Sequence, residues 1–241
     1  MSRKKLIAYV DGFNLYNGVR DSFAHRYLWL DLVRLMENYR PDSEVVRVNY
    51  FSARVLDDSE ALSRQDTYIA ALEALHPERI AVRLGRYQSK SVACKACGAE
   101  WTSYEEKETD VNLALAIARD AIAPEADDYF LLSGDSDAAP AVREAMRLNP
   151  SGFYAAFFPP GRHSEELKQL MPASRIIGRD KLRNSQLPET VSDANGSTFE
   201  QPAKWKPETF LPEPGTPSPI LRAKPDGSMP TPRDMNGHRH T

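Results

Sequence analysis

The 241-residue sequence has only two cysteines, Cys94 and Cys97, which lie together in "CKAC". Two neighbouring cysteines cannot form the disulfide framework of a small secreted protein, so a reducing environment is expected. The sequence also lacks any apolar run near the roughly 20 residues that a membrane-spanning helix needs. Six apolar residues precede Asp11, too few for the apolar region of a secretory signal. We therefore expect a cytoplasmic protein without a membrane partner.

A strong excess of charge of either sign is absent as well. The chain has 31 basic and 34 acidic residues, which gives a formal net charge of −3. The overall field therefore favours neither a nucleic acid nor a membrane surface, and a polyanion must be bound by a local group of cations. Hydrophobic residues make up 41% of the chain, enough for a proper core in one large domain or two small ones.

Short apolar runs alternate with segments of helical periodicity. The expected strands are 5–10, 45–55, 80–88, 128–134 and 152–158, with a weaker sixth at 175–178. The expected helices are 30–39, 58–75, 109–122, 138–148 and 164–171. Most of the strands are apolar throughout, as in a sheet covered on both faces. The alternation predicts an α/β fold with a central parallel sheet of about five strands.

The composition changes near Asn184. From there to Thr241, ten of 58 residues are proline and seven are Leu, Ile, Val or Phe. Such a segment has too few apolar side chains to bury a core. We therefore expect one globular domain at 1–183 and a proline-rich, disordered tail at 184–241. An alternative role for the tail is to dock a protein partner through a motif around Trp205, Phe210 or Leu211.

Polar residues follow two of the predicted strands. Asp11 and Asn14 follow the first strand, and Asp135 and Asp137 follow the fourth, in "SGDSD". Taken alone, each acid is explained as a turn former. However, the carboxyl ends of parallel strands lie at one edge of a sheet, where ligands bind. Two such places in one chain indicate one shared site, in which the hydroxyls of Ser133 and Ser136 are expected to support the acids by hydrogen bonds.

Asp110 belongs with these acids, because it opens the apolar helix predicted at 109–122. Its alternative role is to complement the helix dipole. Two carboxylates about 4 Å apart repel by roughly 4 kcal/mol at an effective dielectric near 20, so converging acids must protonate or hold a cation. Oxygen ligands without His or Cys favour Mg²⁺ or Mn²⁺, and Mg²⁺ is usually completed by a substrate phosphate. The pattern therefore predicts phosphate-ester chemistry.

Three blocks, "YVDGFNLYNG", "EKETDVNLALAIARDA" and "YFLLSGDSDAAPAV", resemble the NYN-domain family, the LabA-like branch of the PIN-like nuclease superfamily. The resemblance covers roughly residues 1–180 and implies a three-layer PIN-like fold, with the metal-dependent ribonuclease activity of several members. One departure is Ala138, where a larger apolar residue is common. The implied catalytic residues are Asp11, Asn14, Asp110, Asp135 and Asp137, and the four aspartates would be the metal ligands.

On this interpretation a bound Mg²⁺ or Mn²⁺ polarises the scissile phosphate and lowers the pKa of its water. The candidate substrate-binding residues are Lys107, Arg54 and Arg86 for phosphate and Tyr16 for stacking on an unpaired base. Each of the four is equally explained as an ordinary surface or core residue. The predicted substrate is single-stranded RNA.

Two other functions compete with this interpretation. A haloacid-dehalogenase-type phosphatase needs a second Asp two residues after its nucleophilic Asp, and Phe13 stands at that position here. A non-catalytic module that binds RNA or a protein stays open as the alternative. The intact acids argue against it, because mutually repelling carboxylates have no purpose without a cation.

The "CKAC" stretch resembles half of a zinc site, and structural zinc takes four ligands. A homodimer would bring two such pairs together. The favoured interpretation is instead an irregular insertion in which Cys94 and Cys97 are reduced thiols.

Overall fold

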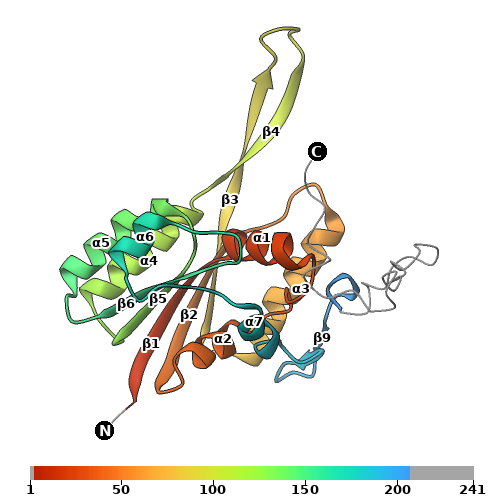
Figure 1. The fold of residues 1–241 in the computed structure, drawn as a ribbon. Helices are drawn as coiled ribbons and strands as arrows, with labels where there is room; N and C mark the ends of the chain where they lie inside the picture. The colour runs from red at the N-terminus through yellow and green to blue at the C-terminus, as the bar shows by residue number, and fades with distance from the viewer. Residues whose placement is uncertain (1–2, 207–241) are drawn as a thin grey trace, which may run out of the picture. The chain divides into compact units, whose positions relative to one another are not determined.

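The computed structural model of the chain describes residues 3–206 (Figure 1). The disorder predicted for 207–241 lies outside the described residues. In chain order the elements are β1 (Lys4–Asp11), α1 (Gly12–Phe23), α2 (Leu32–Tyr39), β2 (Ser43–Ala53), α3 (Ser59–Leu75), β3 (Ile80–Ala93), β4 (Glu100–Lys107), α4 (Thr109–Ile122), β5 (Asp128–Leu132), η1 (Ser136–Ala138), α5 (Ala139–Leu148), β6 (Phe153–Phe158), α6 (Glu165–Leu170), β7 (Arg175–Ile176), α7 (Arg179–Asn184), β8 (Thr190–Ser192), β9 (Thr198–Glu200) and η2 (Ala203–Trp205).

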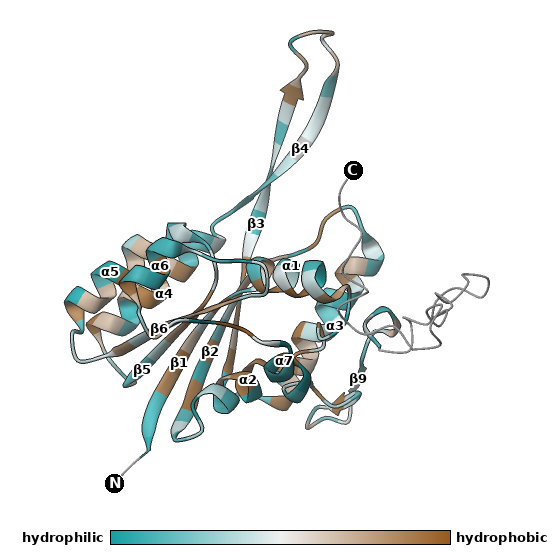
Figure 2. Ribbon diagram, viewed as in Figure 1, coloured by the Kyte–Doolittle hydropathy of each residue, from teal (hydrophilic) through white to brown (hydrophobic). Residues whose placement is uncertain are grey.

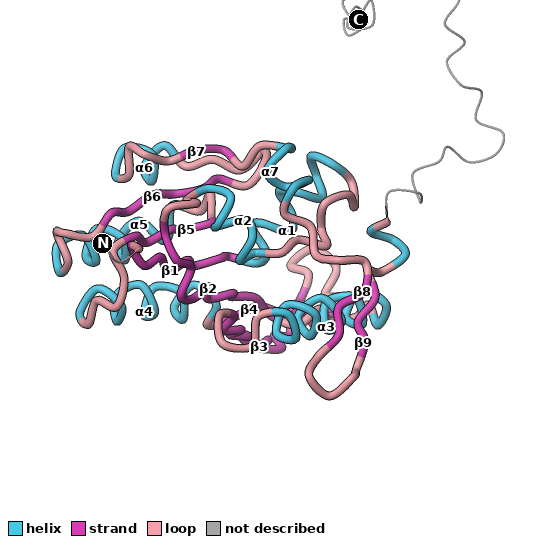
Figure 3. Tube along the Cα trace, turned by 90° about the horizontal axis from the view of Figure 1, so that it is seen from below, coloured by secondary structure: helices cyan, strands magenta, loops and turns pink. Residues whose placement is uncertain are grey.

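A seven-stranded sheet forms the centre of the fold, in the order β4-β3-β2-β1-β5-β6-β7. Figure 3 shows this order from β7 at the top to β3 and β4 at the bottom. All neighbouring strands are parallel except β3 and β4, which form an antiparallel hairpin. The predicted α/β fold with a central parallel sheet is therefore confirmed.

Helices cover both faces of the sheet, because alternate residues of each strand point to opposite sides. In β1, Leu6 and Val10 belong to the core under α1, α2, α3 and α7. Ile7 and Tyr9 belong to the core under α4, α5 and α6. The result is the expected three-layer arrangement. In residues 3–206, no helix is both long and apolar enough to cross a membrane.

The β3–β4 hairpin extends past the carboxyl edge of the sheet (Figure 1). Figure 2 shows that this hairpin is mostly hydrophilic, in contrast to the central strands. The irregular insertion predicted around Cys94 is wrong, because the cysteines lie in the hairpin turn. Gly98 N donates to Cys94 O at 2.8 Å, and Gly98 has φ of 71°, which favours glycine. Strand β4 was missed because little of it is apolar.

The domain boundary predicted at residue 184 is wrong, because residues 184–206 belong to the folded unit. The β8–β9 hairpin lies beside α3 (Figure 3). Trp205 is 4% exposed, and its ring centroid lies 6.4 Å from that of Trp29 and 5.9 Å from that of Tyr68. The apolar residues of this segment are few, but the tertiary fold buries them, so the average composition concealed their role.

We predict that a chain ending at Asn184 is much less stable than one ending at Lys206, because only the longer chain retains the buried Trp205. Trp205→Ala alone should lower the free energy of unfolding by about 3–5 kcal/mol, the usual cost of deleting a buried aromatic side chain. Thermal and urea unfolding measure both. Trp101→Ala is the matched control, because Trp101 is 51% exposed. Equal stability of the two truncated chains would contradict the revised boundary.

Candidate active site at the carboxyl edge of the sheet

Asp11 is the last residue of β1, at the carboxyl edge of the sheet. Its Oδ1 accepts a hydrogen bond from Asn14 N at 3.0 Å and so caps α1. Its Oδ2 accepts from the Ser133 hydroxyl at 2.9 Å. The carboxylate is therefore held on both oxygens, and Asp11 is only 8% exposed.

The segment after β5 is fixed to the same place. Ser133 Oγ accepts from Asp135 N at 3.0 Å, and Asn14 Oδ1 accepts from Gly134 N at 2.9 Å. We call the four residues Asp11, Asn14, Ser133 and Gly134 the β1–β5 clamp. The expected support from Ser133 is confirmed, whereas the hydrogen bonds of the described residues show no such role for the Ser136 side chain. The two acidic motifs of the sequence therefore meet.

Two glycines permit this close packing. A Cβ on Gly12 would lie 2.7 Å from the Tyr50 ring and 2.8 Å from the Phe51 carbonyl oxygen. A Cβ on Gly134 would lie 2.9 Å from the backbone of Arg162 and His163. Backbone atoms cannot move aside as a flexible side chain can, so both positions require glycine.

Asp110 is an exposed residue in the first turn of α4. Partial burial raises the pKa of Asp110, and the negative charges of Asp135, Glu106 and Asp137 raise it further. Burial also raises the pKa of Asp11, and Asp110 and Asp135 add to this, although the hydrogen bonds from Asn14 and Ser133 act in the opposite direction. The structure therefore brings the four aspartates into one negative field.

Glu106 also contributes to this field but was not among the predicted site residues. Its Oε1 accepts hydrogen bonds from Thr109 N, at 3.1 Å, and from the Thr109 hydroxyl. It belongs to the "EKETD" block, so its spacing from Asp110 was the available signal. The signal was missed because β4 was not predicted, and without that strand nothing fixed the direction of the Glu106 side chain.

The aspartates suit a hard divalent ion by chemical type and position, since they offer only oxygen ligands around one buried carboxylate. In residues 3–206, however, no three His, Cys, Asp or Glu side chains are close enough as they stand to hold an ion. Asp110 and Asp137 are exposed at the surface, so loading an ion requires a rearrangement of side chains around Asp11.

The predicted substrate-binding residues lie in different places. Arg86 and Lys107 are paired in register at the base of the β3–β4 hairpin, next to the start of α4. Arg86 forms an ion pair with Glu108, and Lys107 Nζ lies 3.0 Å from a Glu105 oxygen. Lys107 therefore lies three residues before Asp110, and Arg86 lies beside Lys107 on the neighbouring strand.

Arg54 and Tyr16 are not joined to the aspartates by any contact among the described residues. Arg54 follows β2 and pairs with Asp66 at 3.4 Å. Tyr16 lines a cavity between α1 and α3, and the Arg20 guanidinium lies 5.6 Å from its ring centroid. Arg54 and Tyr16 lie near predicted site motifs in the sequence, but their side chains do not lie at the acidic edge.

A parallel sheet covered by helices on both faces, with acids gathered at its carboxyl edge, is consistent with the PIN-like class of proteins. The model of the NYN domain matches residues 5–172, and the chain belongs to the NYN-domain family. A NYN domain is a member of the PIN-like superfamily and indicates a nuclease-like function.

The chain is also similar to two known proteins. The chain is 30% identical over 169 residues to a protein of Pseudomonas putida named 6-hydroxy-3-succinoylpyridine 3-monooxygenase HspA, covering 56% of this chain and 53% of that one. The chain therefore spans about half the length of this curated relative. A crystal structure of a protein of unknown function from Vibrio parahaemolyticus has 21% identity and a TM-score of 0.53, covering 77% of this chain and 97% of that one. The second similarity supports the fold alone.

We predict that Asp11→Asn leaves the metal-free protein at least as stable as the wild type at pH 7. Burial raises the pKa of the Asp11 carboxyl in the folded state above its ordinary value of 3.8. The protonated carboxyl therefore stabilises the folded state fully at pH values below 3.8, and this stabilisation is lost as the pH rises through the folded-state pKa. Asparagine retains the capping oxygen without the charge. The advantage of Asp11→Asn should therefore disappear at low pH, as urea unfolding at several pH values will show.

The control for this experiment is Asp11→Ala, which removes the charge and both hydrogen-bond acceptors. Its free energy of unfolding should fall by about 1–2 kcal/mol, as for the loss of a helix cap. If Asp11→Asn destabilises the protein as much as Asp11→Ala does, the charge of Asp11 favours the folded state and our electrostatic account is wrong.

We further predict less than one zinc ion per purified chain. Cys94 and Cys97 are both free, and the pKa of the Cys94 thiol is lowered by hydrogen bonds from the Cys97 and Ala96 backbone and from the Cys97 side chain. A lowered pKa favours the thiolate that binds metal, but this turn supplies two of the four ligands that structural zinc needs. Elemental analysis measures the content, and stoichiometric zinc would show that other ligands complete the site.

Proposed function

We propose that this protein is a metal-dependent ribonuclease that cleaves phosphodiester bonds of single-stranded RNA. The observation that supports the proposal most strongly is the β1–β5 clamp, which holds Asp11 within the negative field of Asp110, Asp135 and Asp137 at the ligand-binding edge of the sheet. Asp11, Asp110, Asp135 and Asp137 would hold Mg²⁺ or Mn²⁺.

The bound ion would supply a Lewis acid and a water of lowered pKa. The residues of the chain provide position and charge. Hydrogen bonds on both oxygens fix the Asp11 carboxylate, so its charge is already oriented before an ion binds. Asn14 uses its oxygen for Gly134 N, which leaves its Nδ2 group to donate to a water or to a phosphate oxygen. Asn14 is therefore assigned to orientation.

If the protein is a ribonuclease, the β3–β4 hairpin would contact the RNA. It extends past the edge where the aspartates lie, with Arg86 and Lys107 at its base (Figure 1). Further along it, Trp101 and Tyr104 are 51% and 48% exposed. Exposed aromatic rings stack on unpaired bases, and cations attract the phosphates, so the hairpin suits a single strand better than a duplex.

A non-catalytic module that binds RNA or a protein is the second candidate function. It is favoured by one observation: in residues 3–206, no three acidic side chains already converge on one point. The relative from Pseudomonas putida is named a monooxygenase, but it matches this chain over only about half its own length. We do not extend that activity to this protein.

The decisive experiment is incubation of a labelled single-stranded RNA pool with the full chain, with and without Mn²⁺. We expect Mn²⁺-dependent cleavage, and Asp135→Asn should slow it by about a hundredfold or more, because a metal ion supplies several kcal/mol of transition-state stabilisation. Asparagine retains the oxygen that accepts from Asp137 N, so the loop should stay folded.

Asp180→Asn is the matched control. Asp180 is an exposed acid in the first turn of α7, and its loss should leave cleavage unchanged. If the wild type cleaves no single-stranded RNA but binds it, the module replaces the nuclease. If Asp135→Asn cleaves as fast as the wild type, the aspartates are not the metal ligands.

A further inference from the structure

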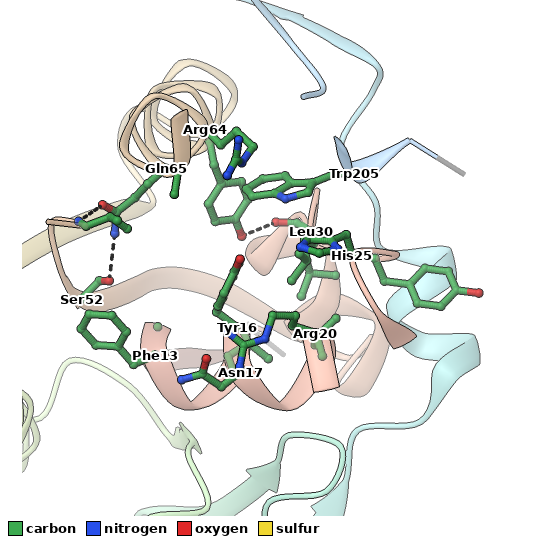
Figure 4. Close-up of a pocket in the computed structure, with 18 of the residues that line it drawn as sticks. Phe13, Tyr16, Asn17, Arg20, His25, Leu30, Ser52, Arg64, Gln65 and Trp205 are labelled. Atoms are coloured by element: carbon green, nitrogen blue, oxygen red, sulfur yellow. Dashed lines mark hydrogen bonds between the residues drawn. The ribbon is translucent and has the colours of Figure 1, made fainter. Parts of the chain in front are cut away.

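A cavity of about 480 Å³ lies between α1 and α3, on the face of the sheet opposite α4. Figure 4 shows its walls: Tyr16 and Arg20 come from α1, Arg64 and Gln65 come from α3, and Trp205 closes one side. The volume is within the range of small-molecule sites. Gly12 and Phe13 also line it, directly after Asp11, so the cavity begins beside the acidic edge.

The walls of the cavity are largely aromatic. Tyr50, Tyr68 and Trp205 form one side, with ring centroids 6.2 Å apart for Tyr50 and Tyr68 and 5.9 Å apart for Tyr68 and Trp205. Phe13 and Tyr16 lie across the space from Trp205 (Figure 4). Flat rings on both sides favour a flat, aromatic ligand.

The lining of the cavity holds three cationic side chains and the acidic Asp58. Arg20, Arg64 and Lys204 line it, together with His25. Burial lowers the pKa of His25, and the charges of Lys204, Arg64 and Arg20 lower it further, so all three cations act on one region. Arg20 and Arg64 have acidic partners outside the lining, whereas Lys204 forms no ion pair within the described residues. Because Asp21 and Glu60 offset the charges of Arg20 and Arg64, the stabilisation of an anion in the cavity rests mainly on Lys204.

An unpaired donor completes the site. Trp205 is 4% exposed, and its Nε1 is buried with no hydrogen-bond partner in the described part of the chain. Figure 4 shows this nitrogen on the edge of the indole that faces Leu30 and His25. The buried Trp29 differs, since its Nε1 donates to Pro188 O at 2.7 Å. Buried indole N–H groups usually find an acceptor, so a ligand acceptor is expected here.

We propose that the cavity binds a planar aromatic ring that bears an anionic group, with the ring between the aromatic walls and the anion near Lys204, Arg64 and Arg20. Trp205 Nε1 donates to an acceptor of the ligand. Two sources have this chemistry: a nucleotide, with its base and phosphate, or a free aromatic carboxylate. The nucleotide source rests on the proposed ribonuclease function, whereas the free acid does not.

Isothermal titration calorimetry of the metal-free full chain tests this, because no cleavage is involved. The probes are adenosine 5′-monophosphate, adenosine and nicotinate. We expect saturable binding of at least one anionic probe. If the nucleotide monophosphate binds, adenosine should bind about tenfold more weakly, because it has the ring without the anion.

Trp205→Phe and Lys204→Ala should each weaken binding about three- to tenfold, the effect of one lost hydrogen bond or ion pair. Lys168→Ala is the matched control, because Lys168 is an exposed lysine of α6 outside the cavity, and it should leave binding unchanged.

Binding of the nucleotide but not of nicotinate supports the nucleotide source. Binding of nicotinate but not of the nucleotide supports the free acid, and it does so even if the protein cleaves no RNA. If no probe binds at millimolar concentration, the proposal is overturned. It is also overturned if binding is unchanged in both Lys204→Ala and Trp205→Phe, with thermal unfolding confirming that each variant is folded.

Discussion

The hydrogen bonds between the end of β1 and the start of the segment after β5 determine the rest of the site. Asp11 and Ser133 are 122 residues apart in the sequence, yet the serine hydroxyl donates to the Asp11 carboxylate and accepts from Asp135 N. Asn14 adds a second link through Gly134 N. Adjacent parallel strands make this meeting possible, because β1 and β5 are neighbours in the sheet and end at the same edge. Without the clamp, the two acidic motifs would be unrelated turns.

The clamp has an electrostatic consequence. It buries one carboxylate, and burial, together with the charges of Asp110 and Asp135, raises the pKa of Asp11. A carboxylate in such a field is most stable when protonated or beside a cation. A protein that functions near neutral pH can meet this requirement with a divalent ion, which links the fold to phosphodiester chemistry. The cavity beyond Gly12 is lined by Arg20, Arg64 and Lys204, so its cations lie on the other side of α1 from the aspartates.

The sequence predicted the elements whose signals are local. Continuous apolar runs predicted β1, β2, β5 and β6, and the acids after the strand ends were assigned to one edge. Elements that depend on distant contacts were missed. Helix α1 contains Gly12 and Gly18, which are poor helix formers, but packing against Tyr50 and Pro159 requires them. Trp205 lies in a segment of low apolar content, and only the fold shows that it packs on Trp29.

The most direct test of this account is to locate a bound Mn²⁺ ion by nuclear magnetic resonance, since a paramagnetic ion broadens the amide signals near it. At substoichiometric Mn²⁺, the account predicts selective loss of the Gly12, Val111, Gly134 and Ser136 signals, because these residues flank the four aspartates. The Gly152 signal, from the residue before β6 at the opposite edge of the sheet, should persist as an internal reference. Broadening elsewhere with these four signals intact, or no broadening at all, would contradict the claim that the carboxyl edge holds a divalent ion.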